Sequence, residues 1–400
     1  MTPDLDLVLF GATGYTGRLV AEYLATASKR EPLRWAIAGR SRDKLETLRR
    51  SLAAPVDMIV VDVLDGAAVG AIARRTRAVC TTAGPFAKYG GALLGACAEA
   101  GTHYCDLTGE LQWVRRMIDT HHERARATGA RIVNSCGFDS IPSDLGTWAV
   151  QQEFIARHGI PADEVTALYG ETSGGMSGGT VASGLQTATE ADHDREVRRL
   201  LANPHALDPD PDAIPDPVRD EAAIGWNRDL KMFTIPFFMA GFNTRIVRRG
   251  HALAGFPWGR DFRYREVMST PASARGLAMA VGFTGGMAAL AFAVKRPWLR
   301  DQLAKRAPQP GEGPTPEERA RGHWKVRFVA RRDDHRLRYE AGDRADPGYG
   351  STAKMLGESA LCLALDPLDS PGGVVTPSVA MGGRLLDRLR RAGLTFAPAG

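Results

Sequence analysis

The stretch LVLFGATGYTGRLV, residues 7–20, decides how the chain begins to fold. Its three glycines, Gly11, Gly14 and Gly17, follow the short apolar run Leu5–Phe10 and precede apolar residues at helical spacing. This order predicts a β-strand, a glycine turn and an α-helix. Because a turn without Cβ atoms lets N–H groups at a helix N-terminus approach a phosphate, the stretch favours a nucleotide cofactor. A turn that uses glycine only for close packing is the alternative.

The next predicted strand, RWAIAG at residues 34–39, bears on the choice of cofactor. Enzymes that use NAD usually place Asp or Glu at this strand end to hold the ribose 2′-hydroxyl, whereas Arg accommodates a 2′-phosphate. Arg40 follows the strand here, and no acidic residue stands at that place. We therefore expect NADP(H). A solvated arginine that opens a helix over residues 41–52 is the alternative.

Two further strands extend the pattern. Residues 56–63, VDMIVVDV, predict a strand with Asp62 near its end, and residues 78–86 predict another that runs into a turn. The residues of this turn are Gly84, Pro85 and Phe86. Strands that alternate with helices predict an α/β fold, with a Rossmann-type parallel sheet whose carboxyl edge binds the ligand.

Beyond about residue 150 the pattern changes. Residues 324–340 alternate apolar and polar side chains around Asp333-Asp334, which predicts an antiparallel hairpin in a second, α+β domain. We expect a Rossmann domain over residues 1–150 and the second domain over residues 151–345. Residues 346–400 are expected to form helices that pack back on the Rossmann domain.

Composition narrows the classes of partner. The chain has 400 residues, a net charge of +5 and a pI near 9.0, without a block of consecutive basic residues, so no nucleic-acid partner is predicted. Anionic small molecules, such as a phosphate-bearing cofactor or an acyl phosphopantetheine, fit better. The five cysteines contain no C-x-x-C pair, so neither a disulfide framework nor a metal site is indicated. The first strand begins close to Met1 and leaves no room there for a cleavable secretion signal. We therefore expect a cytoplasmic protein.

Residues 276–294 complicate this picture, because 19 uncharged residues lie between Arg275 and the pair Lys295-Arg296. A spanning helix needs about 20 such residues. Four glycines and six alanines weaken the transfer energy of the segment. Three interpretations stay open: a buried core or dimer-interface segment, contact with a membrane surface, and a membrane span. With surface contact the protein would be peripheral at the plasma membrane.

Several longer motifs resemble one known group of enzymes. They are FGATGYTG at 10–17, AGRS at 38–41, TTAGPFAKYG at 81–90, THYCDLTGE at 102–110, CGFDSIPSDLG at 136–146, FNTRIVRR at 242–249, GRDFRYRE at 259–266 and GGVVTPSVAMG at 372–382. The chain resembles the saccharopine-dehydrogenase-like oxidoreductases and, within them, the trans-acting enoyl reductases. Those proteins reduce a double bond in polyketide-derived lipids of the phthiocerol and phenolic glycolipid type.

The resemblance implies an NADPH-dependent enzyme of glycolipid or lipid biosynthesis that acts for a synthase without a working reductase domain. Its substrate would be an acyl or polyketide lipid, free or presented on an acyl carrier domain. The second domain would contribute to substrate binding and to a homodimer.

The resemblance also implies a set of cofactor-binding residues. It places Gly11, Thr13, Gly14, Tyr15, Thr16 and Gly17 on the pyrophosphate, Arg40 and Ser41 near the 2′-phosphate, and Gly84, Pro85 and Phe86 along the ribose and nicotinamide. Asp62 completes the expected cofactor set, and the turn Gly137–Ser140 is placed at the cleft.

Enoyl reduction requires a hydride for the β-carbon, a group that stabilises the enolate and a proton for the α-carbon. Further strands are predicted at residues 103–106 and 131–135. The candidate catalytic residues at the ends of these strands are Tyr104, Asp106, Asp139 and Ser140. For each of them, a capping or turn role is the alternative.

The sequence also bears on three alternative functions. A short-chain dehydrogenase needs Lys four residues after a Tyr, and none of the eight tyrosines meets this condition. A saccharopine-reductase-like enzyme that reduces C=N bonds in amino-acid metabolism would need a basic cluster for substrate carboxylates. Candidates for that cluster are Arg245, Arg248, Arg249, Arg263 and Arg265. A non-catalytic, membrane-associated nucleotide-binding protein is the third interpretation.

Overall fold

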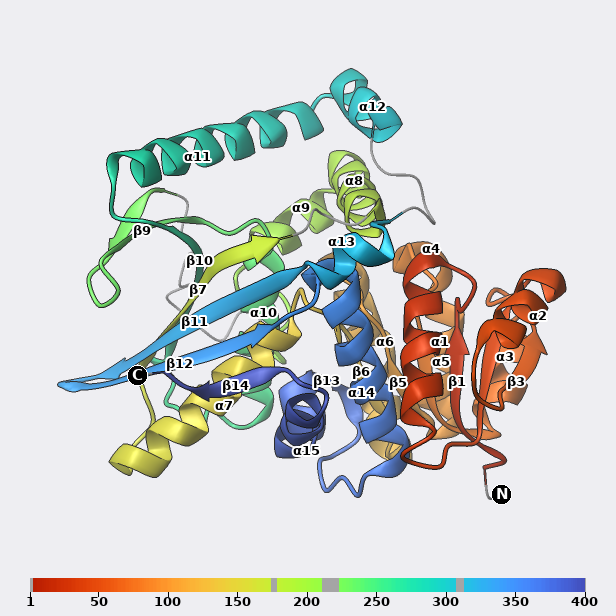
Figure 1. Ribbon diagram of the computed structural model, residues 1–400. Coiled ribbons are helices and arrows are strands. Elements are labelled where there is room, and N and C mark those ends of the chain that lie inside the picture. The colour runs from red at the N-terminus through yellow and green to blue at the C-terminus, as the bar shows by residue number, and fades with distance from the viewer. Residues whose placement is uncertain (1–2, 174–177, 211–222, 307–312, 400) are drawn as a thin grey trace.

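The computed structural model describes residues 3–173, 178–210, 223–306 and 313–399. Two seven-stranded sheets form its framework, and helices cover both of them (Figure 1). The glycine-rich sequence at residues 171–179, ETSGGMSGG, predicts a loop that seats a ligand or acts as a hinge, and its residues 174–177 lie outside the described residues.

The first sheet is entirely parallel, with the strand order β13-β6-β5-β4-β1-β2-β3. Its strands are β1 Leu5–Phe10, β2 Trp35–Gly39, β3 Asp57–Val60, β4 Thr76–Thr81, β5 His103–Cys105, β6 Arg131–Val133 and β13 Gly373–Val375. Its connecting helices are α1 Tyr15–Ala27, α2 Arg42–Ser51, α3 Gly66–Ala73, α4 Phe86–Tyr89, α5 Gly91–Ala100 and α6 Leu111–Thr128. The predicted Rossmann-type sheet is confirmed. The strand order reverses between β1 and β4, which opens a crevice at their carboxyl ends.

The apolar residues of β1 explain why this sheet is covered on both faces. Leu7 and Leu9 belong to one buried cluster, whereas Val8 and Phe10 belong to another. Since neighbouring side chains of a strand point to opposite faces, a continuous apolar run needs helices on both sides.

The second sheet is mixed, with the order β14-β12-β11-β7-β10-β9-β8. Its strands are β7 Glu164–Ser173, β8 Gly225–Asn227, β9 Met232–Pro236, β10 Arg263–Thr270, β11 His323–Arg332, β12 His335–Asp343 and β14 Thr395–Pro398. The hairpin predicted over residues 324–340 is confirmed as β11 and β12, which turn at Asp333 with φ of 50°. The helices α7 Ile141–His158 and α10 Ala240–Leu253 contact this sheet.

Most of the remaining helices lie above that sheet in the view of Figure 1, and the last of them lies beside the start of β11, toward α1. They are α8 Gly178–His193, α9 Arg195–Ala202, α11 Ala274–Val294, α12 Pro297–Arg306 and α13 Pro316–Ala320. Only 6% of the most apolar window of α11 is buried. The interpretation of residues 276–294 as a segment of the chain's own core is therefore wrong.

The C-terminal segment returns to the first sheet, as predicted. The helix α14, Thr352–Leu365, contacts α1, β1, β4 and β5, and β13 then extends the parallel sheet. The helix α15, Pro377–Arg391, packs on α7 and leads to β14 of the second sheet. One chain segment thus belongs to both sheets.

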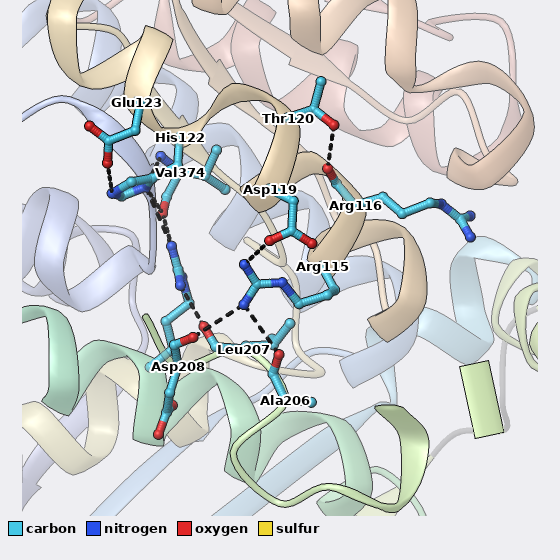
Figure 2. A network of polar contacts seen from close by, with 11 residues as sticks. Arg115, Arg116, Asp119, Thr120, His122, Glu123, Ala206, Leu207, Asp208 and Val374 are labelled. Atoms are coloured by element: carbon cyan, nitrogen blue, oxygen red, sulfur yellow. Dashed lines mark hydrogen bonds and ion pairs between the residues drawn. The ribbon is translucent and has the colours of Figure 1, made fainter. Parts of the chain in front are cut away.

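Polar contacts also join the first domain to the second (Figure 2). Arg115 of α6 donates hydrogen bonds to the carbonyl oxygens of Ala206, at 3.4 Å, and Asp208, at 3.1 Å. Arg249 of α10 is buried and donates to the carbonyl oxygen of Leu207 and, at 2.6 Å, to that of Val374 in β13. The segment around residue 207 therefore links α6 to α10.

Candidate functional site

The glycine turn holds α1 against the ends of β1 and β4. Gly11 has a φ of 72°, and a Cβ atom there would lie 2.8 Å from Oγ1 of Thr82. A Cβ atom on Gly17 would lie only 2.1 Å from the carbonyl oxygen of Gly11. Only glycine fits at both positions. The ability of this turn to bind a phosphate depends on the close approach of these backbone segments.

The first turn of α1 is open to an anion. Gly14 is the N-cap residue, and it has no side chain that could accept a hydrogen bond from the N–H groups of the first turn. Those N–H groups, from Tyr15, Thr16 and Gly17, have no partner within the helix. Thr13 lies half-buried just before them. A pyrophosphate would meet these N–H groups and the positive end of the helix dipole, so the turn fits a dinucleotide.

The side chain of Tyr15 faces the second domain. Its hydroxyl donates to the carbonyl oxygen of Pro314 and accepts a hydrogen bond of 2.6 Å from Arg319 in α13. Its ring lies 4.7 Å from that of Tyr349, edge to face. Because the side chain of Tyr15 is engaged in this way, its predicted contact with the pyrophosphate would be made by its backbone N–H.

The residues predicted around the 2′-phosphate lie at the carboxyl ends of β2 and β3, which are neighbours in the sheet. Arg40 is exposed, and among the described residues no carboxylate pairs with it. Ser41 accepts a hydrogen bond of 3.4 Å from the N–H of Lys44 and so caps α2. Asp62 is exposed and accepts a hydrogen bond of 3.0 Å from the N–H of Leu64.

The predicted turn after β4 is fixed by a residue that sequence analysis did not single out. The carboxylate of Glu110 is buried and accepts hydrogen bonds of 2.8 Å from the N–H groups of Phe86 and Ala87. It also accepts one of 2.9 Å from Ser183 of α8. The only signal in the sequence was the acidic end of the motif THYCDLTGE. Because Glu110 contacts both α4 and α8, it positions the segment that contains Gly84 and Pro85.

Tyr104 and Asp106 lie together at the end of β5, and both are fully buried. The hydroxyl of Tyr104 donates to Asp106 at 3.0 Å, and the amide of Asn134 donates to the same carboxylate at 2.8 Å. The backbone N–H groups of Thr108 and Ser135 complete the set, each at 3.0 Å. Burial raises the pKa of Asp106 to about 6. These four donors give Asp106 a role in joining β5 to β6, and its catalytic role stays a prediction.

Three parts of the chain hold the turn Gly137–Ser140. The N–H of Phe138 donates to Oγ1 of Thr352 at 3.1 Å, and the ring of Phe138 lies 5.0 Å from that of Trp324 in β11. Ser140 is fully buried and donates to Oδ1 of Asn243 in α10 at 3.0 Å. The hydroxyl of Ser140 is therefore used to fix the turn.

Asp139 differs from the other three candidates. Its side chain is half-buried, and its carboxyl has no hydrogen-bond or ion-pair partner in the part of the chain that the structure describes. Burial raises the pKa of Asp139 from its ordinary value of 3.8 to about 6. A carboxyl in this state is suited to donate a proton near neutral pH.

The sheet places Asp139 on the side expected for the nicotinamide. A dinucleotide lies across the crevice of a Rossmann sheet, with one nucleotide over each half of the strands. Arg40 and Asp62 are predicted to bind the adenosine half over β1, β2 and β3, so the nicotinamide is expected over β4, β5 and β6. Asp139 follows β6, which is three strands or about 14 Å from β1.

A cavity of about 540 Å³ lies elsewhere. It is lined at the amino ends of β4 and β5 by residues such as Thr76 and His103. Since ligands of parallel sheets bind at the carboxyl ends of the strands, this cavity carries no argument for the active site.

Comparison with known proteins defines the class. Residues 7–133 match the family described as the saccharopine dehydrogenase NADP-binding domain. The structure is similar to that of saccharopine dehydrogenase (L-Glu forming) from Saccharomyces cerevisiae, with a TM-score of 0.52, 10% identity and coverage of 98% of this chain and 99% of the other. The protein is thus an NADP-dependent oxidoreductase with a saccharopine-dehydrogenase-like fold.

Two relatives in sequence define the narrower group. A protein of Mycobacterium tuberculosis (strain ATCC 25618 / H37Rv), provisionally named a trans-acting enoyl reductase, is 39% identical over 98% of this chain and 97% of its own length. The trans-acting enoyl reductase of Mycobacterium leprae (strain TN) is 38% identical over 99% of both chains. The chain belongs to the family of the trans-acting enoyl reductases. The predicted family, cofactor and enzyme class are confirmed.

Proposed function

We propose that the protein reduces a C=C bond of an acyl or polyketide lipid intermediate with NADPH. The observation that carries this proposal is the 39% identity, over nearly the whole chain, with a protein named as an enoyl reductase. The open first turn of α1, exposed Arg40 and the carboxyl of Asp139 supply binding, coenzyme selection and a proton at one edge of the sheet.

The division of labour follows from the chemistry of the bond. NADPH, which the glycine turn and Arg40 would hold, would supply a hydride for the β-carbon of the enoyl group. Reduction of the C=C bond would also require a proton at the α-carbon. Asp139 donates that proton from its carboxyl and regains one from solvent. Glu110 and Ser140 position the two turns that border this reaction site.

The structure gives no support to the C=N reductase. Two of the arginines suggested for its carboxylate site already bind backbone carbonyl groups. Arg248 donates to Pro204 at 2.9 Å, and Arg249 donates to Leu207 and Val374. These contacts hold α10 in place.

An assay of NADPH oxidation with two substrates tests the proposal. The purified protein is given an enoyl thioester and, separately, an imino diacid. We expect turnover of the thioester and none of the diacid. Turnover of the diacid alone would overturn the proposal, and so would tight NADPH binding with no turnover of any enoyl thioester.

We also propose that a carrier domain presents the acyl group and that the protein works in the cytoplasm as a homodimer. The net charge of +5 supports attraction to an anionic phosphopantetheine. Light scattering measures the oligomeric state, and a comparison of carrier-bound with free thioesters tests presentation. A monomer at working concentration, or equal kcat/KM for both substrates, would contradict the respective part.

A further inference from the structure

The helix α11 stands away from the rest of the chain. It runs above the second sheet and leads to α12 near α8 (Figure 1). Its mean hydropathy reaches 1.9, yet only 6% of this apolar window is buried. Among its exposed side chains are Met279, Val281 and Phe292, with exposed fractions of 53%, 56% and 56%. An apolar surface of this extent on a soluble chain marks a site of interaction.

The apolar residues surround α11 rather than forming one stripe. Only Gly276 and Ala280 of its 21 residues are buried. A helix that is apolar on all sides suits the interior of a protein or of a bilayer, whereas docking on one partner helix would leave its other faces in water. Acyl chains of lipid can cover such a helix over most of its circumference.

Both ends of α11 are held by the same body. At the start, Thr270 of β10 donates to the carbonyl oxygen of Gly276 at 3.0 Å. Beyond the end, Arg300 of α12 pairs with Asp192 of α8 at 2.5 Å. A spanning helix would place one of these contacts across the membrane from the other. The helix is therefore tethered along one side of the protein.

The charges around α11 favour an anionic surface. No acidic residue occurs between Pro271 and Arg300. Arg275 lies in the first turn, and Lys295 and Arg296 follow the last turn. Trp298, which is 66% exposed, follows this pair after Pro297. Cations and an aromatic ring at the border of an apolar helix are typical of the membrane interface.

We propose that α11 lies in the plane of an anionic lipid bilayer, with its apolar side chains among the acyl chains and its terminal cations on the lipid phosphates. This contact would hold the protein at a membrane surface. It is independent of the reaction, because no catalytic step depends on it.

Co-sedimentation with lipid vesicles tests the proposal. The full-length protein is mixed with phosphatidylcholine vesicles, with and without phosphatidylglycerol. The test variant carries Val281→Glu and Phe292→Glu, and the control carries Leu64→Glu at an exposed position after β3. We expect the wild type and the control to bind the anionic vesicles. The double variant should bind these vesicles at least about tenfold more weakly. Circular dichroism and thermal unfolding show whether each variant has folded.

Three results would overturn the proposal. In the first, the wild type stays in solution with both kinds of vesicle. In the second, the double variant binds vesicles as well as the control does. In the third, light scattering without lipid shows a dimer that the double variant converts to monomers, because a second copy would then cover α11. A further pair of changes, Lys295→Gln and Arg296→Gln, is expected to reduce the preference for anionic vesicles, and an unchanged preference would refute the role of charge.

Discussion

At the scale of single residues, the local environment distinguishes four candidates that look equivalent in the sequence. Tyr104, Asp106 and Ser140 are fully buried and hydrogen-bonded, whereas the carboxyl of Asp139 has no partner within the described part of the chain. All four follow or end predicted strands, so strand position alone could not rank them. The difference depends on contacts from residues far away in the sequence, such as Asn134 and Asn243.

The role of Asp139 predicts the pH dependence of the reaction. Since the protonated carboxyl is the donor and its pKa is about 6, kcat should fall as the pH rises above about 6. Asp139→Asn should lower kcat by about 10²- to 10⁴-fold and remove this pH dependence. The measurement is a pH profile of kcat for both forms, with Asp334→Asn in the exposed hairpin turn as the control. Because the pKa of Asp106 is also raised to about 6, an unchanged profile in Asp139→Asn would assign the dependence to another group.

The carboxyl of Asp139 should lower the free energy of unfolding at high pH. Its pKa in the folded state, about 6, lies above its ordinary value of 3.8, so the folded state binds the proton more tightly than the unfolded state. The free energy of unfolding therefore falls as the pH rises from about 4 to about 6, and it stays lower above that range. Asp139→Asn should raise the free energy of unfolding by about 1–3 kcal/mol at pH 8 and by little at pH 3.5. Urea unfolding at the two pH values measures this, and a destabilised variant at pH 8 would contradict the argument.

Arg40 is expected to choose between the coenzymes. Its exposed guanidinium has no carboxylate partner among the described residues, so a 2′-phosphate would supply one. Arg40→Ala should weaken NADPH binding by about 10- to 100-fold and leave NADH binding nearly unchanged. Calorimetric titration with both coenzymes measures the change. The control is Arg74→Ala, at an exposed position just before the amino end of β4. Equal losses for both coenzymes would mean that Arg40 does not recognise the phosphate.

At the scale of elements, the strands and helices of the first sheet follow from the sequence. The apolar run of β1, the glycine turn and the spacing of apolar residues in α1 are local signals, and the structure reproduces them. The contribution of Glu110 was not predictable, because its hydrogen-bond partners in α4 and α8, Phe86 and Ser183, lie 24 and 73 positions away in the sequence. The exposure of α11 was not predictable either, since apolar composition is the same for a core helix and a membrane-bound one.

The glycine turn makes a prediction at this scale. A methyl group on Gly17 would lie 2.1 Å from the carbonyl oxygen of Gly11, so Gly17→Ala should push α1 away from β1. We expect a loss of NADPH affinity of at least about tenfold and a lower melting temperature. The control is Gly66→Ala at the start of α3, where an added Cβ has no neighbour within 4 Å. Calorimetry and thermal unfolding give both quantities, and unchanged affinity in Gly17→Ala would show that close packing of the turn does not matter for the coenzyme.

At the scale of the whole molecule, the two sheets share one core and one candidate site. A single buried cluster contains Leu9 of β1, Phe154 of α7 and Phe328 of β11. The turn that carries Asp139 is held by Thr352 of the C-terminal segment and by Asn243 of α10. The sequence predicted the return of the C-terminal segment, but not that this segment would fix the turn. Its contribution depends on a long-range contact over 214 positions.

The transfer of deuterium from labelled coenzyme tests the central claim most directly. The protein is supplied with an enoyl thioester and NADPH that carries deuterium at the transferable position, and the product is analysed by mass spectrometry. We predict one deuterium at the β-carbon and one solvent proton at the α-carbon, with turnover strongly reduced in Asp139→Asn. A saturated product without deuterium, or no saturated product although NADPH binds, would contradict the assignment as an NADPH-dependent enoyl reductase.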